Sequence, residues 1–411
     1  MSSFISKILI KTVTAGLLTT ALLSSCSKNN DDKADYIFLF IGDGMGSQNV
    51  ALTESYLSYK AGKIGGEQLC FTTFPCYGMA DTYSANFAIT CSAASGTAIA
   101  TGSKTLNRNI GVDAEGNPVK SIAYELQEDN YNIGIISSVP LNHATPAAFY
   151  TNVGKRYKYY EIMKSLPQSG FKFFAGSGFI KYFGKDNKEQ SSAEYLRENG
   201  YNVCFSEEEF NQADKDGKII LCQPYNKESE PANYDVGGPQ PEGHITLSRM
   251  VENALELFSD KKPFFIMCEG GEIDWAAHSN KVMPTVKSVI AFDDAIRVAY
   301  EFYKKHPDNT LIVVTSDHET GGASLGTGTG HRESIGWAYL DSVYTANNST
   351  NRLTDEENRE LNWKANIGWT SEDHTGGAVP VYAIGKGAER FCGRMDNTEI
   401  KAKILAEEPC K

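Results

Sequence analysis

Carboxylate and imidazole side chains recur at the ends of apolar runs in this sequence, and they are the residues best suited to do chemistry. The apolar runs read as buried strands, and the side chains that follow them or lie in a separate EDHTGG segment are Asp43, Glu269, Asp274, His278, Asp317, His318 and His374. Carboxylates and imidazoles are the ligands of Zn²⁺ and Mg²⁺ in proteins. Three of the seven histidines of the chain belong to this set. Their convergence on one crevice would make a site for more than one metal ion.

The spacing of these residues suggests how they divide among ions. Asp274 and His278 are four residues apart, so one turn of helix puts both on one face as two ligands of one cation. Glu269 lies at a strand end five residues earlier, where it can serve a neighbouring ion. Asp43 is presented by the tight glycine turn GDGMG. Each pattern is weak by itself. An Asp/His pair at a spacing of four residues, for example, is more often a surface hydrogen bond than a metal site.

A serine opens a segment rich in small residues, ITCSAASGTAIATG, which predicts a helix over about 93–100. Ser92 would then lie beside free backbone N–H groups at the positive end of that helix, a suitable place for a nucleophile that receives an anion. The alternative is that Ser92 is only a helix N-cap, and taken alone this alternative is the stronger one.

The elements that must position these residues are strands alternating with helices. Apolar runs predict strands at 36–41, 132–138, 172–175, 263–268 and 310–315. Helices are predicted at about 246–259 and 284–306, each with one apolar stripe. This alternation favours an α/β fold with a mostly parallel central sheet and helices on both faces. Ligands of such sheets bind outside the carboxyl ends of the strands, where most of the candidate residues lie.

Length and charge restrict the organisation further. The chain has 411 residues, and the candidate ligands run from Asp43 to His374, which favours one large domain over residues 36–411. Two polar stretches, about 181–243 and 321–370, are expected to be peripheral insertions, the second a crown or lid near the site. The net charge of −12 and the lack of a basic stretch argue against a nucleic-acid partner.

The N-terminus predicts export and anchoring. Residues 1–25 read as a signal peptide, and the LSSC sequence that ends at Cys26 resembles the lipobox of bacterial lipoproteins, in which this cysteine carries the lipid. Residues 26–35 would be a polar tether, which places the domain in the cell envelope, in the periplasm or at the outer membrane surface. The alternative is an ordinary signal peptide with a chance cysteine. Such a compartment permits disulfides, for example Cys204–Cys222 or Cys392–Cys410, while Cys91 and Cys268 are expected to be unpaired.

Together these motifs resemble the alkaline phosphatase family, in the family's order and over nearly the whole mature chain. The resemblance implies a phosphate monoesterase with two zinc ions and one magnesium ion. It implies that Ser92 is the phosphorylated nucleophile and that Arg156 grips phosphate. It implies the following ligands: Asp43 between two metals, Asp274, His278 and His374 at the first zinc, Asp317 and His318 at the second zinc, and Glu269 with the Thr145 hydroxyl at magnesium. Family members are often dimeric, so a homodimer is a further expectation.

Three positions depart from the commonest family pattern. Cys91 stands before the nucleophile where the family commonly has Asp, so Arg156 loses a usual anchor. His143 and Trp275 flank the third metal position, where the best-known bacterial relative has Asp and Lys, and both are candidate substrate contacts. For His143 three roles stay open, namely direct metal ligation, a water-mediated contact with phosphate, and packing. The identity of the third metal stays open with them.

The sequence leaves two alternative functions open. A sulfatase or phosphodiesterase of the same superfamily is the main alternative, although CSAAS lacks the Pro and Arg of the C-x-P-x-R motif of oxidised-cysteine sulfatases. A lipoprotein that binds metal or phosphate without turnover is the non-enzymatic alternative. His244, His306 and His331 have no ligand pattern and are expected in loops or on the surface.

Overall fold

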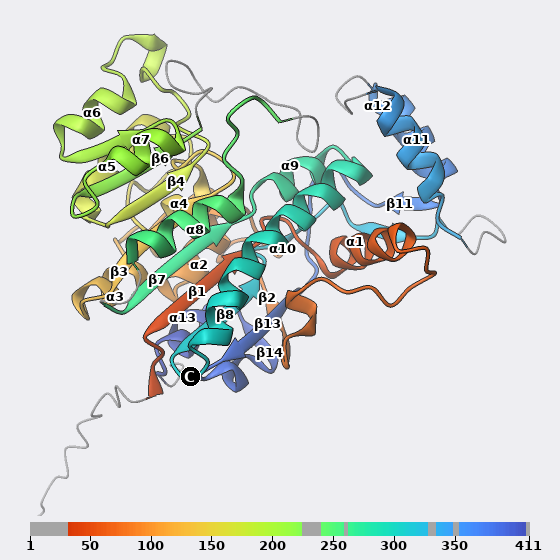
Figure 1. Ribbon diagram of the computed structural model, residues 1–411, viewed down its shortest axis with the longest axis horizontal. Helices are drawn as coiled ribbons and strands as arrows, with labels where there is room; N and C mark the ends of the chain where they lie inside the picture. The colour runs from red at the N-terminus through yellow and green to blue at the C-terminus, as the bar shows by residue number, and fades with distance from the viewer. Residues whose placement is uncertain (1–31, 224–239, 259–261, 328–333, 348–352, 408–411) are drawn as a thin grey trace, which may run out of the picture. The chain divides into compact units, whose positions relative to one another are not determined.

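Strand β1 (Tyr36–Ile41) lies inside a 10-stranded sheet, and the other elements are arranged around it (Figure 1). The computed structural model describes residues 32–223, 240–258, 262–327, 334–347 and 353–407. The order across the sheet is β14-β2-β13-β8-β1-β7-β3-β4-β6-β5. The remaining strands of this sheet are β2 (Cys76–Asp81), β3 (Asn132–Ser137), β4 (Phe173–Gly176), β5 (Tyr201–Cys204), β6 (Lys218–Cys222), β7 (Phe264–Glu269), β8 (Thr310–Thr315), β13 (Val379–Gly385) and β14 (Gly393–Asp396).

Of these strands, β13 alone runs against the others. It pairs antiparallel with both β2 and β8, whereas the remaining pairs of the sheet are parallel. The mostly parallel α/β sheet that the sequence predicts is therefore confirmed, and so are its five predicted strands, to within one or two residues.

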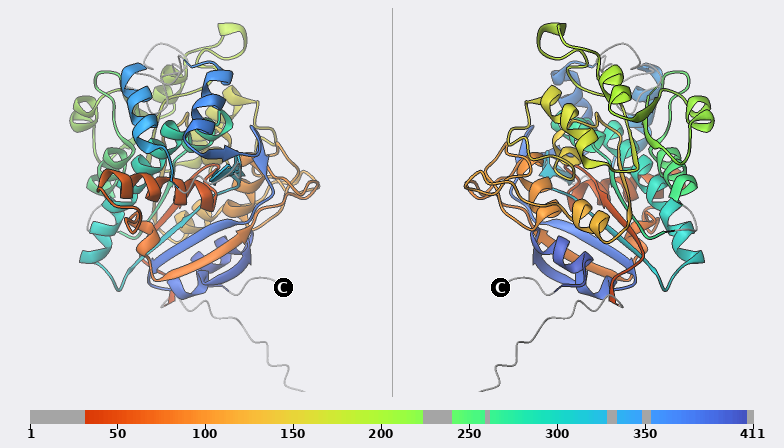
Figure 2. Two further views of the ribbon diagram at one scale, coloured as in Figure 1. Left: turned by 90° about the vertical axis from the view of Figure 1, so that its right-hand side faces the viewer. Right: turned by 90° about the vertical axis from the view of Figure 1, so that its left-hand side faces the viewer.

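Helices cover both faces of the sheet, because the apolar side chains of the central strands alternate (Figures 1 and 2). On one face lie α2 (Ser92–Thr101), α3 (Ile122–Glu128), α4 (Ala144–Ala147), α5 (Tyr159–Ser169), α6 (Ser192–Glu198) and α13 (Glu399–Ile404). On the other lie α1 (Ser47–Lys60), α7 (Glu207–Gln212), α8 (Leu247–Phe258), α9 (Glu272–His278) and α10 (Val282–Lys305). The predicted helices near 93–100, 246–259 and 284–306 correspond to α2, α8 and α10.

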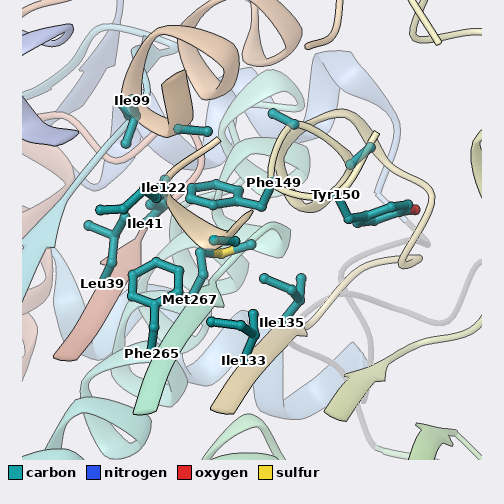
Figure 3. Packing of buried hydrophobic residues seen from close by; sticks show 14 of the residues in the cluster. Leu39, Ile41, Ile99, Ile122, Ile133, Ile135, Phe149, Tyr150, Phe265 and Met267 are labelled. Carbon is teal, nitrogen blue, oxygen red and sulfur yellow. The ribbon is translucent and has the colours of Figure 1, made fainter. Parts of the chain in front are cut away.

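Strand β1 shows how this two-sided core is made. Leu39 and Ile41 point to the first face, where Figure 3 shows them beside Phe265 and Met267 of β7 and beneath Phe149. Phe38 and Phe40 point to the second face and pack against α10. Each of these side chains is fully buried, which stabilises the fold by roughly 1.5–3 kcal/mol per side chain. The core thus fixes the strands whose ends carry the candidate site residues.

The stretch 181–243 differs from the expectation. We predicted a peripheral insertion without strand order, but its described part contains α6, α7 and the two strands β5 and β6, which extend the main sheet at one edge. The expected lack of strands was wrong, because these strands are short and lie between charged segments, whereas the insertion itself stays a prediction. Residues 224–239 of this stretch lie outside the described residues.

The stretch 321–370 lies to one side of the sheet. It contains β10 (Ala323–Leu325), α11 (Trp337–Asn347), α12 (Asp355–Lys364) and β11 (Ile367–Trp369), and β10 and β11 form a separate two-stranded sheet. Its apolar residues form a third cluster with Leu52 of α1 and with the first turns of α10. Figure 2 shows α11 and α12 beyond the edge of the main sheet. His331 lies outside the described residues.

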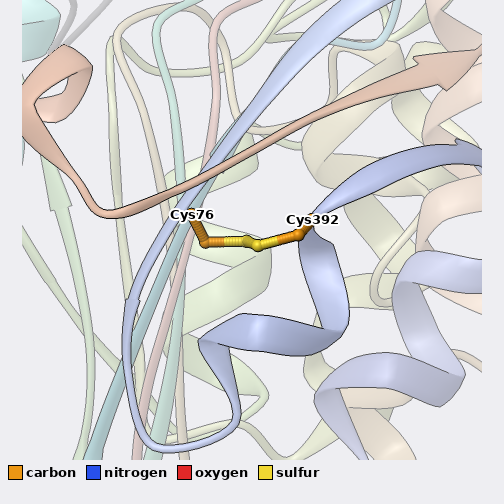
Figure 4. Close-up of a disulfide and its surroundings, with 2 residues drawn as sticks. All are labelled: Cys76 and Cys392. Atoms are coloured by element: carbon orange, nitrogen blue, oxygen red, sulfur yellow. A yellow bond between two sulfur atoms is a disulfide. The ribbon is translucent and has the colours of Figure 1, made fainter.

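The disulfide differs from both pairs that we named. Cys76, at the start of β2, bonds to Cys392, just before β14 (Figure 4). Cys204 and Cys222 are free and buried, and the partner that we proposed for Cys392, Cys410, lies outside the described residues. The bond joins residues 316 positions apart, a separation that offered no local signal. Cys91 and Cys268 are free, as predicted.

The predicted signal peptide, the tether up to residue 31 and the lipidation site Cys26 lie outside the described residues. Within the part of the chain that the structure describes, no helix is both long enough and apolar enough to cross a bilayer.

Candidate active site

Four strand ends form a row at the carboxyl edge of the sheet. The parallel register aligns Ser137 of β3 with Glu269 of β7, Glu269 with Ile41 of β1, and Ile41 with Thr315 of β8. The chain then turns at each end, so that side chains from segments far apart in sequence meet there. The site lies at the edge that parallel α/β sheets generally use for ligands.

Three groups of potential metal-binding side chains gather along this edge. Within each group the candidate ligand atoms lie within 4.8 Å of one another. The first group is Asp274, His278 and His374, the second is Asp43, Asp317 and His318, and the third is Asp43, His143 and Glu269. Asp43 belongs to two groups, which matches a carboxylate placed between two ions.

The turn that presents Asp43 requires glycine. Gly44 has φ +72°, and a Cβ at this position would lie 2.7 Å from Thr320 Oγ1 and 2.8 Å from Asp274 Oδ1. Its backbone N–H donates to Asp317 Oδ1 at 3.1 Å. A side chain at Gly44 would therefore push apart the segments that carry the ligand groups.

Each of the three histidines in the first two groups has its Nδ1 engaged and its Nε2 directed at a carboxylate. His374 Nδ1 donates to the Thr90 carbonyl at 2.9 Å, and His278 Nδ1 donates to the Glu372 carbonyl. His318 Nδ1 lies 3.2 Å from the Thr320 hydroxyl, which itself donates to Asp274 Oδ1 at 2.5 Å. These contacts leave the Nε2 lone pairs for a metal ion. The Nε2 atoms of His278 and His374 lie 3.4 and 3.7 Å from Asp274 Oδ1.

Bound cations would stabilise the ionised form of the buried carboxylates of the site. Burial and then the neighbouring carboxylates Asp317, Asp274 and Glu269 raise the pKa of Asp43 well above its usual value. Burial is also the main cause that raises the pKa of Glu269 to about 8. Divalent ions among these carboxylates would supply the charge that keeps them ionised.

Several polar atoms of the site lack hydrogen-bond partners among the described residues. They are both carboxylate oxygens of Asp43, Asp317 Oδ2, Glu269 Oε1, Thr145 Oγ1 and His143 Nδ1, all of them buried. Buried polar atoms are rarely left unsatisfied, so these atoms are suited to ligands that the protein itself does not provide. The donor set, carboxylate and hydroxyl oxygens with imidazole nitrogens, fits zinc and magnesium.

Ser92 lies beside the second of these donor groups. It is the first residue of α2, and its Oγ is 3.2 Å from His318 Nε2 in the second group. Helix α2 is buried throughout, and Gly96 allows it to pack closely on α4, because a Cβ there would lie 3.3 Å from Thr145 Cα. The same packing brings Thr145 to the site. Ser92 thus has both a helix N-terminus and the donor groups beside it.

Arg156, His143 and Trp275 lie together at the side of the third group. Arg156 Nη2 is 3.0 Å from His143 Nε2, and the His143 ring meets the Trp275 ring edge to face at a centroid distance of 6.1 Å. Burial, followed by the charge of Arg156, lowers the pKa of His143 to about 3, so this imidazole is neutral. Of the other histidines, His306 packs against Tyr36 and Phe302, and His244 lines a cavity beside α8 and α9.

Three residues that support the site were not anticipated. The Ser137 hydroxyl donates to Glu269 Oε2, and Thr320 links His318 to Asp274 as described above. Glu319 accepts hydrogen bonds from the Gly322 N–H at 2.8 Å and from the Thr375 hydroxyl, which ties the segment after β8 to the one that carries His374. Ser137 could have been found from its position at the end of a predicted strand, whereas no sequence signal marks Thr320 or Glu319.

Comparisons with known proteins agree with this geometry. The family model described as alkaline phosphatase matches residues 34–177 and 226–408. Alkaline phosphatase 4 of Bacillus subtilis is 30% identical, over 96% of this chain and 94% of that protein, and alkaline phosphatase 3 of the same organism is 29% identical over 98% and 95%.

Solved structures of alkaline phosphatases resemble the fold. The cold-active enzyme of a psychrophilic Shewanella species has a TM-score of 0.77 at 27% identity and covers 90% of this chain and 99% of its own. The enzyme of the Antarctic bacterium TAB5 has a TM-score of 0.73 at 29% identity, over 91% and 98%. A variant of the TAB5 enzyme with a histidine replaced by aspartate holds Mg in its M3 site. This chain therefore belongs to the alkaline phosphatase family and is a phosphoric monoester hydrolase.

Proposed function

We propose that this protein hydrolyses phosphate monoesters through a phosphoserine intermediate on Ser92, at a site with two zinc ions and one magnesium ion. The observation that carries the proposal is the position of Ser92 Oγ, 3.2 Å from His318 Nε2 and at the N-terminus of α2. A nucleophile at this point has potential metal ligands on one side and helix N–H groups on the other. Family membership supports the reaction class.

The metal ions would be held by the groups described above. Asp274, His278 and His374 would hold the first zinc, and Asp43, Asp317 and His318 the second. Asp43 and Glu269, with the Thr145 hydroxyl, would hold magnesium, and the Mg in the M3 site of the TAB5 variant supports a magnesium ion there. Bound zinc and magnesium would supply positive charge that lowers the pKa of a coordinated hydroxyl or water and neutralises charge on the reacting phosphoryl group.

The protein's own groups position the reaction. Ser92 Oγ forms a bond to phosphorus as the bond to the leaving alcohol breaks, and its proton is given up to solvent or to that alcohol. The first-turn N–H groups of α2 face the transferred anion, and Arg156 holds two equatorial oxygens in a fork. Water then displaces phosphate from Ser92, which restores the hydroxyl.

A phosphodiesterase or sulfatase activity is the alternative for this site. Cys91 is free, but it lies in CSAAS, which lacks the Pro and Arg of the C-x-P-x-R motif. A protein that binds metal or phosphate without turnover is a weaker alternative, since Ser92 and Arg156 lie beside complete donor groups.

One set of rates separates these functions. Zinc- and magnesium-loaded protein is assayed at alkaline pH on an aryl phosphate monoester, the corresponding diester and the sulfate ester. We expect the monoester to react fastest, with activity lost in Ser92→Ala and in EDTA. A faster diester or sulfate reaction would favour the alternative, and phosphate binding without turnover would favour the binding protein.

We further propose that the protein is exported and anchored by a lipid on Cys26, and that it acts in the cell envelope on small phosphate esters. The supporting observation is the N-terminal sequence that ends in LSSC. Mass spectrometry of the N-terminal peptide from membranes tests this, because an unmodified Cys26 in the mature protein would exclude the anchor. A homodimer is proposed from family likeness alone, and sedimentation analysis tests it.

A further inference from the structure

An imidazole holds the guanidinium of Arg156 in this structure. Arg156 Nη2 donates to His143 Nε2 at 3.0 Å, and no carboxylate in the described ranges pairs with the arginine. The backbone N–H of Arg156 is also fixed, by a hydrogen bond to the Arg108 carbonyl at 3.0 Å. The contact with His143 thus orients the guanidinium, and the backbone hydrogen bond fixes the point from which the side chain extends.

His143 is itself held firmly, as a positioning group must be. It is 7% exposed, it precedes the first turn of α4, and its backbone N–H donates to the Pro140 carbonyl at 2.8 Å. Its ring is flanked by Trp275. The His143 imidazole therefore has little freedom to move with the arginine, so the position of the ring determines the position of the guanidinium.

The chemistry of the contact fixes the state of the ring. Arginine only donates hydrogen bonds, so His143 Nε2 is the acceptor and its lone pair is occupied. A neutral imidazole with Nε2 as the acceptor carries its proton on Nδ1, so this buried nitrogen, which has no partner among the described residues, can donate to a water or a phosphate oxygen but cannot bind a metal ion. Neither nitrogen then has a lone pair free for a metal ion, although His143 lies near Asp43 and Glu269. In this arrangement the His143 ring acts as a hydrogen-bond acceptor for Arg156.

The residue before the nucleophile provides no competing anchor. Cys91 has no carboxylate, and its Sγ accepts a hydrogen bond from the Arg108 N–H at 3.1 Å. Since the Arg108 carbonyl accepts from Arg156, a carboxylate at position 91 would lie near the segment that carries the arginine. That carboxylate is missing, and His143 provides an acceptor for the guanidinium.

We propose that His143 is a positioning residue that holds Arg156 ready for phosphate by accepting one guanidinium N–H, and that it is not a ligand of the third metal. This inference rests on the proposed phosphatase function. With one donor engaged by the imidazole, Arg156 keeps its remaining N–H groups for two phosphoryl oxygens. The Arg156 guanidinium is thus ordered before the substrate binds, so that less side-chain conformational entropy is lost on binding.

The test compares variants that separate the hydrogen bond from the ring. His143→Gln keeps an acceptor at about the distance of Nε2, whereas His143→Phe keeps a ring and removes the acceptor. For the metal-loaded proteins we would measure kcat/KM on an aryl phosphate, the affinity for inorganic phosphate by calorimetry, and the metal content. We expect His143→Phe to weaken phosphate binding and to lower kcat/KM by roughly 10- to 100-fold, the usual effect of losing a hydrogen bond to a charged group. His143→Gln should recover most of this loss, and every variant should keep the metal content of the wild type.

Three double variants show whether the effect passes through Arg156. In an Arg156→Ala background, His143→Phe should cause little further loss, because the group that it positions is already gone. Adding Cys91→Asp to His143→Phe should restore phosphate affinity, whereas the matched Cys91→Ser should not, and this rescue would also show that His143→Phe folds.

Loss of a metal equivalent in His143→Phe, effects that multiply with Arg156→Ala, or a Gln variant as impaired as the Phe variant would each overturn the proposal. Failure of the wild type to turn over any phosphate ester would instead refute the proposed function. The calorimetric phosphate affinities would still decide whether His143 supports Arg156.

Discussion

The double membership of Asp43 leads to a specific prediction about metal content. Asp43 lies in both the second and the third donor group, whereas Asp317 lies only in the second. We expect Asp43→Asn to weaken two ions together and Asp317→Asn to weaken chiefly one. Asparagine keeps the size of the side chain and one carbonyl oxygen, so the change mainly removes the negative charge.

The magnitude follows from the burial and spacing of the groups. Asp43 is fully buried, and the donor atoms of each group lie within 4.8 Å of one another, so an ion among them is no farther than about 4 Å from the carboxylate. At an effective dielectric constant of about 20, a unit charge and a divalent ion at that distance attract each other by about 8 kcal/mol. Hydration and rearrangement offset most of this attraction, and removal of one partner of a buried charge pair usually costs at least about 2 kcal/mol, which corresponds to roughly 30-fold weaker binding of each of two ions.

The assay is metal titration of the chelated protein by calorimetry, followed by elemental analysis after dialysis against buffer with a fixed low level of free metal. Glu269→Gln serves as a second control, since Glu269 belongs only to the third group. A result in which Asp43→Asn loses no more metal than either control would refute the inference that one carboxylate is shared by two ions.

Three further outcomes are expected. Ser92→Ala should lower kcat by roughly a thousandfold or more while inorganic phosphate still binds, which steady-state kinetics and calorimetry measure, and unchanged turnover would rule out Ser92 as the nucleophile. In chelated protein the melting temperature should fall as pH rises from about 6.5 to about 8, because burial raises the pKa of Glu269 to about 8 and folding then opposes its ionisation. Metal-loaded protein should show a smaller fall, and equal slopes would contradict the role of these carboxylates as ligands. Cys76→Ser should reduce stability to urea by about 2–4 kcal/mol through loss of the bond to Cys392, and because Cys76 lies at the opposite end of its strand from the site, lost activity in the folded variant would contradict this view.

The strands found from the sequence are those that the sheet buries on both faces. The runs at β1, β7 and β8 are apolar except at their ends because helices cover both sides, and this makes them visible from the sequence. Strand β13 contains Pro380, and β2 contains Gly78, where a Cβ would lie 2.2 Å from the Phe391 carbonyl oxygen. Proline and glycine weaken a strand pattern, so these two strands were missed.

The contacts of the candidate site likewise divide into those that the sequence predicted and those that it did not. Asp274 and His278 were paired correctly in space from a spacing of four residues, since one helical turn fixes their separation. The contact between Ser137 and Glu269 joins residues 132 positions apart and depends on the register of β3 against β7. The hydrogen bond from Arg156 to His143 depends on rotamers, which no spacing rule encodes. Local geometry was therefore predictable, and contacts set by strand order or side-chain torsions were not.

The central claim is that three donor groups bring divalent ions to the hydroxyl of Ser92, and that this hydroxyl accepts the phosphoryl group. The most direct measurement is mass spectrometry of peptides from protein that has been mixed with inorganic phosphate and quenched in acid. We predict phosphate on Ser92 in the zinc- and magnesium-loaded protein and none after chelation. Turnover of an aryl phosphate by the loaded protein without a trace of modified Ser92 would contradict the claim.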